Sequence, residues 1–148
     1  MLRRPIPLVA AALIAGLVIV LTAATVSAQQ PAFTAKITLT GAAEVPGPGD
    51  LDATGEAKIL IVPANGLVCW QLSWANVDGT VVAAHIHGPA SVTEAAGVLV
   101  PLSVDPAKGC TRVDPVLATT IAGDPGNYYV NIHSVPLFGA GAIRGQLD

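Results

Sequence analysis

The chain has 148 residues, of which 52% are hydrophobic and 11% charged, and its formal net charge at pH 7 is −3. This length allows one domain with a real core once the N-terminal segment described next is set aside. No basic patch is expected in that domain, which argues against a nucleic acid as partner.

The first 28 residues have the pattern of a secretory signal peptide. Two arginines precede an uninterrupted apolar run at 8–21, and small residues then permit cleavage after Ala28. An uncleaved membrane anchor is the alternative, because residues 8–26 are nearly long enough to span a bilayer. We expect cleavage, which would leave a secreted or periplasmic domain at 29–148 with five basic and ten acidic side chains and no attachment to the membrane.

The remaining sequence favours β-structure throughout. Alternating or β-branched segments bounded by glycine and proline turns predict strands at 33–40, 55–62, 67–74, 81–87, 97–102, 110–113, 128–133 and 142–147. A loop is expected at 134–141, and residues 115–121 fit a helical turn or a strand equally well. Short strands with frequent turn signals predict an all-β fold, a Greek-key sandwich or barrel.

Two cysteines, Cys69 and Cys110, lie in the domain that we expect to be exported. An even number of cysteines in an oxidising compartment favours a disulfide bond between them. Two free buried thiols are the alternative.

All three histidines of the chain lie in two of the predicted strands. His85 and His87 are two residues apart, so they point to the same face of one strand. On the later strand, Tyr129, Asn131 and His133 share a face in the same way. If the two strands adjoin, three imidazoles meet at one point, which predicts either a metal site or a hydrogen-bonded polar cluster.

Four segments together resemble the CHRD domain, a module named for its occurrence in chordin and found in many bacterial secreted proteins. These segments are LTGAAEVP at 39–46, AHIHG at 84–88, YYVNIH at 128–133 and GAIRGQL at 141–147. The resemblance covers about 33–147 and implies an immunoglobulin-like or superoxide-dismutase-like β-barrel. Residues 137–140, Leu-Phe-Gly-Ala, depart from the turn that is commoner in the family, which we expect to change only a loop.

A more distant similarity is to the copper-zinc superoxide dismutases. Those enzymes carry a His-x-His pair on a strand, a later histidine, and an arginine near the C-terminus that guides the anionic substrate. His85, His87, His133 and Arg144 are similar in type and order. The bridging histidine and the further zinc ligands have no counterpart, so a dismutase zinc site is not present as such.

The histidine cluster therefore has two interpretations. Three neutral imidazoles with an open fourth position suit zinc or copper, with Arg144 as an electrostatic guide for an anion. This interpretation requires the ligand nitrogens to lie within about 3–4 Å of one another. In the alternative, the histidines form a hydrogen-bonded network with four further residues, and each ring faces a different partner. Those residues are Glu44, Tyr129, Asn131 and Arg144.

We expect a secreted, non-enzymatic binding or scaffolding module whose partner is an extracytoplasmic protein or polymer. The competing hypothesis is a superoxide-dismutase-like protein that binds copper or zinc through the three histidines. No catalytic residue is assigned, because the chain has neither a Gly-x-Ser-x-Gly elbow nor a glycine-rich phosphate loop, and analogy between motifs does not carry function.

Overall fold

The computed structural model describes residues 30–148, so the expected signal peptide and its cleavage after Ala28 lie outside the described residues. The described residues form antiparallel strands, one α-helix and three short 3-10 turns. The strands are β1 (Phe33–Thr40), β2 (Thr54–Val62), β3 (Leu67–Ala75), β4 (Thr80–His87), β5 (Val98–Leu102), β6 (Lys108–Arg112), β7 (Tyr129–Val135) and β8 (Phe138–Gln146). The helix is α1 (Pro115–Gly123), and the turns are η1 (Gly41–Ala43), η2 (Pro63–Asn65) and η3 (Pro125–Asn127). Within this part of the chain, no helix has the length and apolar character needed to cross a membrane.

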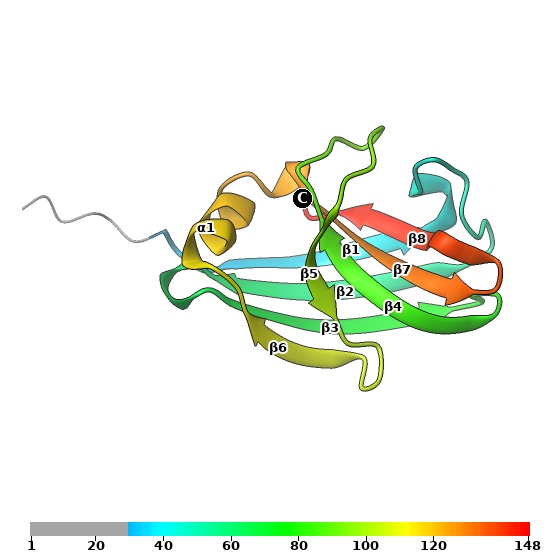
Figure 1. Ribbon diagram of the computed structural model, residues 1–148, viewed down its shortest axis with the longest axis horizontal. Helices are drawn as coiled ribbons and strands as arrows, with labels where there is room; N and C mark the ends of the chain where they lie inside the picture. The colour runs from blue at the N-terminus through cyan, green and yellow to red at the C-terminus, as the bar shows by residue number, and fades with distance from the viewer. Residues whose placement is uncertain (1–29) are drawn as a thin grey trace, which may run out of the picture.

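The strands follow the order β5-β4-β7-β8-β1-β2-β3-β6. At the centre of this order, β8 and β1 share one register pair, Thr40 opposite Arg144, whereas the other neighbouring strands pair over several residues. The sheet folds over at this seam into two halves that face one another (Figure 1). We call them the β4–β7 half (β5, β4, β7 and β8) and the β2–β3 half (β1, β2, β3 and β6). The all-β prediction is confirmed.

The hydrophobic core lies between the two halves. Side chains alternate along each strand, so every second residue points inward and is shielded from water. The fully enclosed side chains of the core include Leu39, Ile61, Val68, Ile86, Val130, Ile132 and Ile143. Each such side chain contributes about 1.5–3 kcal/mol by leaving water, so this layer is the main source of stability.

The ambiguous segment at 115–121 is helical. Asp114 caps the helix, because its carboxylate accepts a hydrogen bond of 2.7 Å from the backbone N–H of Val116. Pro115 occupies the first helical position, where its missing N–H costs nothing. Ala118 and Ile121 are fully buried and extend the core from the helix.

A disulfide bond joins Cys69 to Cys110, as predicted. The two residues are directly opposite each other on β3 and β6, with Cα atoms 4.0 Å apart. The bond lies on the outer face of the β2–β3 half, because the neighbouring Val68 and Trp70 point into the core. It therefore fastens the edge strand β6 to the rest of the sheet.

The connection between β7 and β8 differs from the sequence prediction. A loop was expected at 134–141, but β7 ends at Val135 and β8 begins at Phe138, so the two strands form a tight hairpin. The hairpin brings the backbone carbonyl of Gly139 beside the His133 side chain.

The distribution of charge also differs from expectation. Four of the five basic side chains of the described residues lie on the outer face of the β2–β3 half, namely Lys36, Lys58, Lys108 and Arg112. The prediction of no basic patch is therefore wrong. These residues are far apart in the sequence, and only the strand register brings them together.

Candidate metal centre

The three histidines meet on the outer face of the β4–β7 half. His85 and His87 project from β4 on the side opposite the buried Ile86, and His133 projects from the neighbouring β7. His85 is paired with Asn131, and His133 lies one position further along the same face. One nitrogen from each imidazole lies within 4.8 Å of the others. The strand arrangement thus brings together the three residues that the sequence analysis selected as metal ligands.

His87 has a fixed tautomer and an unused nitrogen. Its Nδ1 lies 2.9 Å from the carbonyl oxygen of Ala96. A carbonyl oxygen only accepts, so the proton is on Nδ1 and the lone pair is on Nε2. That Nε2 is buried, and no hydrogen-bond partner reaches it among the described residues.

His133 has an acceptor at each ring nitrogen. Its Nδ1 lies 3.1 Å from the carbonyl oxygen of Gly139 and its Nε2 lies 3.0 Å from Oδ1 of Asn131, so the neutral ring donates to one of them and keeps a lone pair on the other nitrogen. Nδ1 of His85 lies 3.1 Å from this Nε2. Two nitrogens bound to one tetrahedral zinc ion are separated by about 3.3 Å, given bonds of 2.0–2.1 Å. His85 and His133 therefore already have the spacing of a ligand pair.

Burial keeps the rings of His85 and His133 neutral near pH 7. Desolvation, reinforced by the neighbouring His133 and His87, lowers the pKa of His85 to about 4. Desolvation also lowers the pKa of His133, and its hydrogen bond to Gly139 offsets part of that effect. A neutral imidazole is the form that coordinates a metal ion.

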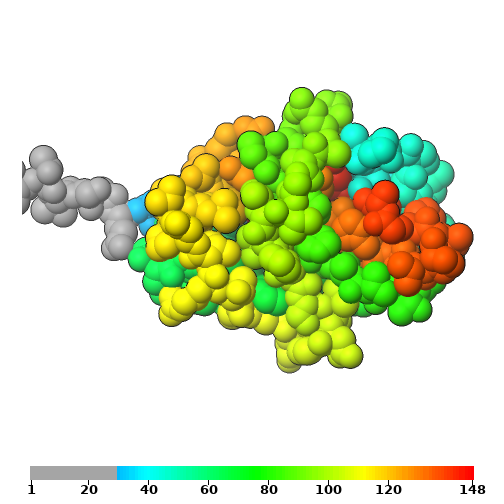
Figure 2. Space-filling model, in the orientation of Figure 1, coloured from blue at the N-terminus to red at the C-terminus, as the bar shows by residue number. Residues whose placement is uncertain are grey.

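The segment at 88–97, which we call the β4–β5 segment, covers this face. Figure 2 shows it in yellow-green over the middle of the molecule. Its Ala96 N–H donates to the Tyr129 hydroxyl at 3.1 Å, and the Gln146 side chain donates to the Ala90 carbonyl at 3.0 Å. The segment is thus fastened at both ends, and it supplies the carbonyl that orients His87.

Arg144 fastens the middle of the same segment. Its guanidinium donates to the carbonyls of Glu94 at 2.8 Å and Ser91 at 2.9 Å, and to the Gln146 side chain at 3.0 Å. It also lies over the Tyr129 ring, 3.5 Å from the centroid. Arg144 is only 1% exposed. Electrostatic guidance of a dissolved anion requires an accessible charge. The geometry of Arg144 therefore favours a role in holding the β4–β5 segment in position.

Glu44 and Asn131 complete the polar cluster. Asn131 is buried, and its side-chain amide lies 3.0 Å from Nε2 of His133. The Glu44 carboxylate is packed against Gly141, in the space that a side chain there would need. Burial raises the pKa of Glu44 to about 7, although the Arg144 charge offsets part of the increase. The residues predicted for the network therefore lie on one face together with the histidines.

The two backbone carbonyls that orient the rings could not be predicted from the sequence. Ala96 and Gly139 act through main-chain oxygen, which every residue has, so side-chain patterns contain no signal for them. Gln146 was also missed. Its place in the Arg-Gly-Gln run, on the same face as Arg144, was the available signal.

A family model of the CHRD domain matches residues 35–147. The chain belongs to the CHRD domain family. The match covers nearly all of the described residues, including the three histidines and the two residues whose carbonyl oxygens accept hydrogen bonds from their rings, Ala96 and Gly139. No curated protein and no solved structure matches the chain.

Proposed function

We propose that this CHRD domain is an extracytoplasmic, non-enzymatic module that binds one zinc or copper ion through His85, His87 and His133. The observation that carries the proposal is the buried Nε2 of His87, which has a lone pair and no partner. Buried polar atoms are nearly always hydrogen-bonded, and an unsatisfied one costs about 1–3 kcal/mol. A metal ion at this position would satisfy it.

The purely structural alternative explains only part of this geometry. A hydrogen-bonded network accounts for Nδ1 of His87, which donates to Ala96, and for both ring nitrogens of His133, which face Gly139 and Asn131. It leaves Nε2 of His87 without a partner. In metal sites, by contrast, the second nitrogen of a ligand histidine commonly donates to a carbonyl or carboxylate, and that bond orients the ring.

Binding requires a small closure and one proton shift. The widest pair of ligand nitrogens, now within 4.8 Å, would approach by roughly 1–1.5 Å to surround an ion with bonds of 2.0–2.1 Å. To coordinate through Nδ1, which now lies 3.1 Å from Nε2 of His133, the His85 ring would carry its proton on its own Nε2, because a coordinating nitrogen needs its lone pair. Three protein ligands leave a fourth position for water or an exogenous group.

The geometry gives less support to a superoxide-dismutase-like activity. Such a mechanism would use Arg144 to guide the anion, and this side chain is enclosed and engaged in three hydrogen bonds. We therefore propose metal binding rather than superoxide dismutation. Bond type alone does not choose between zinc and copper, since imidazole suits both.

Isothermal titration calorimetry tests the proposal. The full chain is expressed with its own N-terminal segment and no histidine tag, purified with the disulfide intact, stripped of metal and titrated with ZnCl₂ and with CuCl₂. We expect one ion per chain for at least one metal, and loss of binding in a His85→Ala/His87→Ala variant. Gln71→Ala, on the opposite face of the molecule, is the control and should bind like the wild type.

Either of two results would refute the proposal: no binding of either metal by the folded wild type, or unchanged binding in the double histidine variant. Circular dichroism and thermal unfolding establish that each variant is folded before titration. If copper binds, the EPR spectrum of the Cu²⁺ complex should show coupling to nitrogen ligands, and the control variant should give the same spectrum.

A further inference from the structure

Three lysines form a straight row across the outer face of the β2–β3 half. Lys36 on β1 is directly opposite Lys58 on β2, Lys58 is opposite Gln71 on β3, and Gln71 is opposite Lys108 on β6. All four side chains are exposed. Neighbouring strands are about 4.8 Å apart, so the row extends over roughly 14 Å perpendicular to the strands. We call these four residues the lysine row.

The lysine row is electrostatically unfavourable for the protein alone. Like charges directly opposite each other on neighbouring strands destabilise a sheet. One carboxylate relieves the repulsion: Glu56 lies 2.9 Å from Nζ of Lys36 and 3.6 Å from Nζ of Lys58. Within residues 30–148, Lys108 forms no ion pair. Among residues 30–148, Glu56 therefore neutralises only part of the row, which keeps an excess of positive charge.

This positive face belongs to an acidic domain. The described residues include five basic and ten acidic side chains, yet strands β1, β2, β3 and β6 contain four of the basic ones and a single acidic one, Glu56. A face of one sign on a molecule of the opposite net charge concentrates the field locally and attracts counter-charged ligands. The net charge of the described residues is negative, so attraction to a polyanion would come from this face and not from the net charge.

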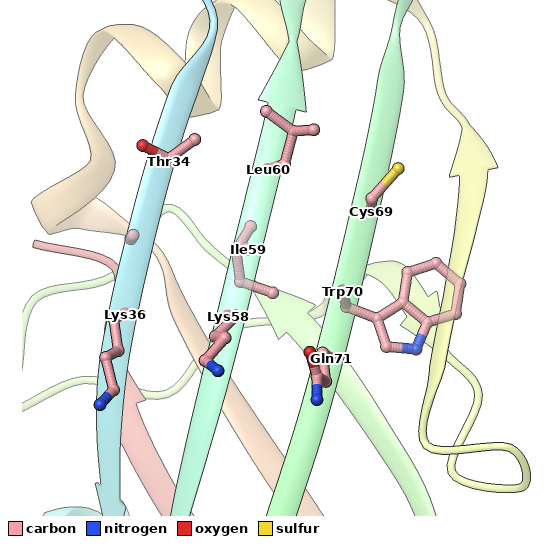
Figure 3. Close-up of a pocket in the computed structure, with 9 residues that line it drawn as sticks. Thr34, Lys36, Lys58, Ile59, Leu60, Cys69, Trp70 and Gln71 are labelled. Atoms are coloured by element: carbon pink, nitrogen blue, oxygen red, sulfur yellow. The ribbon is translucent and has the colours of Figure 1, made fainter.

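A shallow groove runs along three members of the lysine row, Lys36, Lys58 and Gln71, and Lys108 lies beyond its end. Figure 3 shows Lys36, Lys58 and Gln71 side by side, with Thr34, Leu60 and Cys69 in the adjacent row. Leu60 and the Cys69–Cys110 disulfide give this adjacent row an apolar surface. The groove thus combines cations and a side-chain amide with an apolar strip, and it is open to solvent along its length.

We propose that this face binds a linear anionic polysaccharide, with acidic groups on the lysine row and the apolar faces of sugar rings against Leu60 and the disulfide. An open groove across the three strands β1, β2 and β3 fits a polymer better than an enclosed small molecule. Lysine ammonium groups are mobile point charges that suit acidic groups at variable spacing. Trp70 is among the residues that line the groove, but it packs in the core and is 9% exposed, so it offers no open ring for the base stacking that single-stranded nucleic acids need.

The test measures binding of the full-length protein to dextran sulfate, polygalacturonate, neutral dextran and a dT20 oligonucleotide by biolayer interferometry at 50 mM and 300 mM salt. We expect saturable binding to both anionic polysaccharides, none to dextran, and weakening at high salt. Lys36→Gln/Lys58→Gln should weaken binding at least about tenfold and make the salt dependence shallower. Lys108→Gln should weaken binding independently, because this residue does not contact Glu56.

A charge-matched control separates the lysine row from net charge. Leu51→Glu/Val116→Glu changes the net charge by the same two units at exposed positions outside the four strands, and it should bind like the wild type. The proposal fails if the wild type binds neither anionic polysaccharide, if the lysine variants bind unchanged, if the control loses binding equally, or if dT20 binds more tightly than both polysaccharides. The metal-ligand variants leave this face intact, so the two proposals succeed or fail separately.

Discussion

The imidazole of His87 lies parallel to the phenol ring of Tyr129, with centroids 4.9 Å apart and an interplanar angle of 1°. Tyr129 is on β7, between β4 with His87 and β8 with Arg144, and the Arg144 guanidinium also lies over its ring. The Tyr129 hydroxyl in turn accepts a hydrogen bond from Ala96, whose carbonyl orients His87. One tyrosine thus fixes both the plane of the imidazole and the segment that sets its tautomer.

Tyr129→Phe tests this relationship because it keeps the ring and removes only the hydroxyl. The Ala96 N–H loses its acceptor, so we expect a loss of about 1 kcal/mol in the free energy of unfolding. Metal affinity should fall roughly tenfold, the lower end of the effect of changing a group that orients a ligand histidine. Urea denaturation and calorimetric titration measure the two effects. Tyr128→Phe is the neighbouring control, and equal loss of affinity in both variants would contradict the assignment.

Arg144→Lys should loosen the β4–β5 segment while keeping a positive charge. A single ammonium cannot reproduce the donor geometry that reaches Ser91, Glu94 and Gln146 together. We expect the free energy of unfolding to fall by about 3 kcal/mol, the usual size of the loss when a buried charged group loses its partners. Hydrogen exchange followed by mass spectrometry should show faster exchange in residues 88–97. Unchanged exchange there would show that Arg144 does not hold the segment.

Glu44→Gln should change how stability depends on pH. Burial raises the pKa of Glu44 from its usual 4.5 to about 7, so the folded state binds a proton more tightly than the unfolded state. The contribution of Glu44 is therefore fully present below pH 4.5 and is lost as the pH rises to about 7. The loss amounts to about 2 kcal/mol after allowance for partial solvation. The glutamine variant does not titrate, so its stability relative to wild type should increase over this range.

The difference in the free energy of unfolding between the wild type and the Glu44→Gln variant reports the titration of Glu44 without that of the histidines. His85 has a pKa lowered to about 4 by burial and gives the opposite slope, with stability rising as the pH rises from 4 to about 6.5. This term is present in both proteins and cancels in the comparison. Urea denaturation from pH 4 to pH 8 supplies the data, and a difference that does not vary with pH would exclude a titrating Glu44.

Metal should raise the stability of the wild type by an amount that grows with the logarithm of the free metal concentration. An ion that binds only the folded state at 100 times its dissociation constant adds about 2.7 kcal/mol to the free energy of unfolding. The thermal midpoint should therefore rise on adding the metal found by calorimetry, and EDTA should reverse the increase. His133→Ala should show no increase, and the same increase in that variant would place the ion elsewhere.

The disulfide should contribute about 3–4 kcal/mol, because it closes a loop with a sequence separation of 41 in the unfolded chain. Cys69→Ala/Cys110→Ala should unfold at correspondingly lower urea concentration. The bond is far from the histidines, so metal stoichiometry should be unchanged in the folded variant. Loss of metal binding without loss of folding would contradict the separation of the two faces.

The sequence predicted the strands well because their signals are local. Alternation at 33–40 and the β-branched, aromatic run at 128–133 identified β1 and most of β7, and the spacing of His85 and His87 identified their common face. The cysteine pair was predicted from number and compartment alone.

The parts that the sequence did not predict depend on register or on backbone atoms. The lysine row requires Lys36, Lys58 and Lys108 to align across strands, and no local pattern reports that alignment. The orientation of His87 depends on the Ala96 carbonyl, which the β4–β5 segment delivers from nine residues away. The burial of Arg144 follows from the same segment, so an arginine that the sequence suggested as an anion guide is enclosed.

The two halves of the sandwich turn unlike surfaces to opposite sides, because the seam between β8 and β1 folds one sheet back over the other. Copies of this domain laid along a polymer by the lysine row would all direct their histidines away from it. The number of domain copies per length of polymer, rather than the affinity of each site alone, would then set how many ions that length of polymer retains.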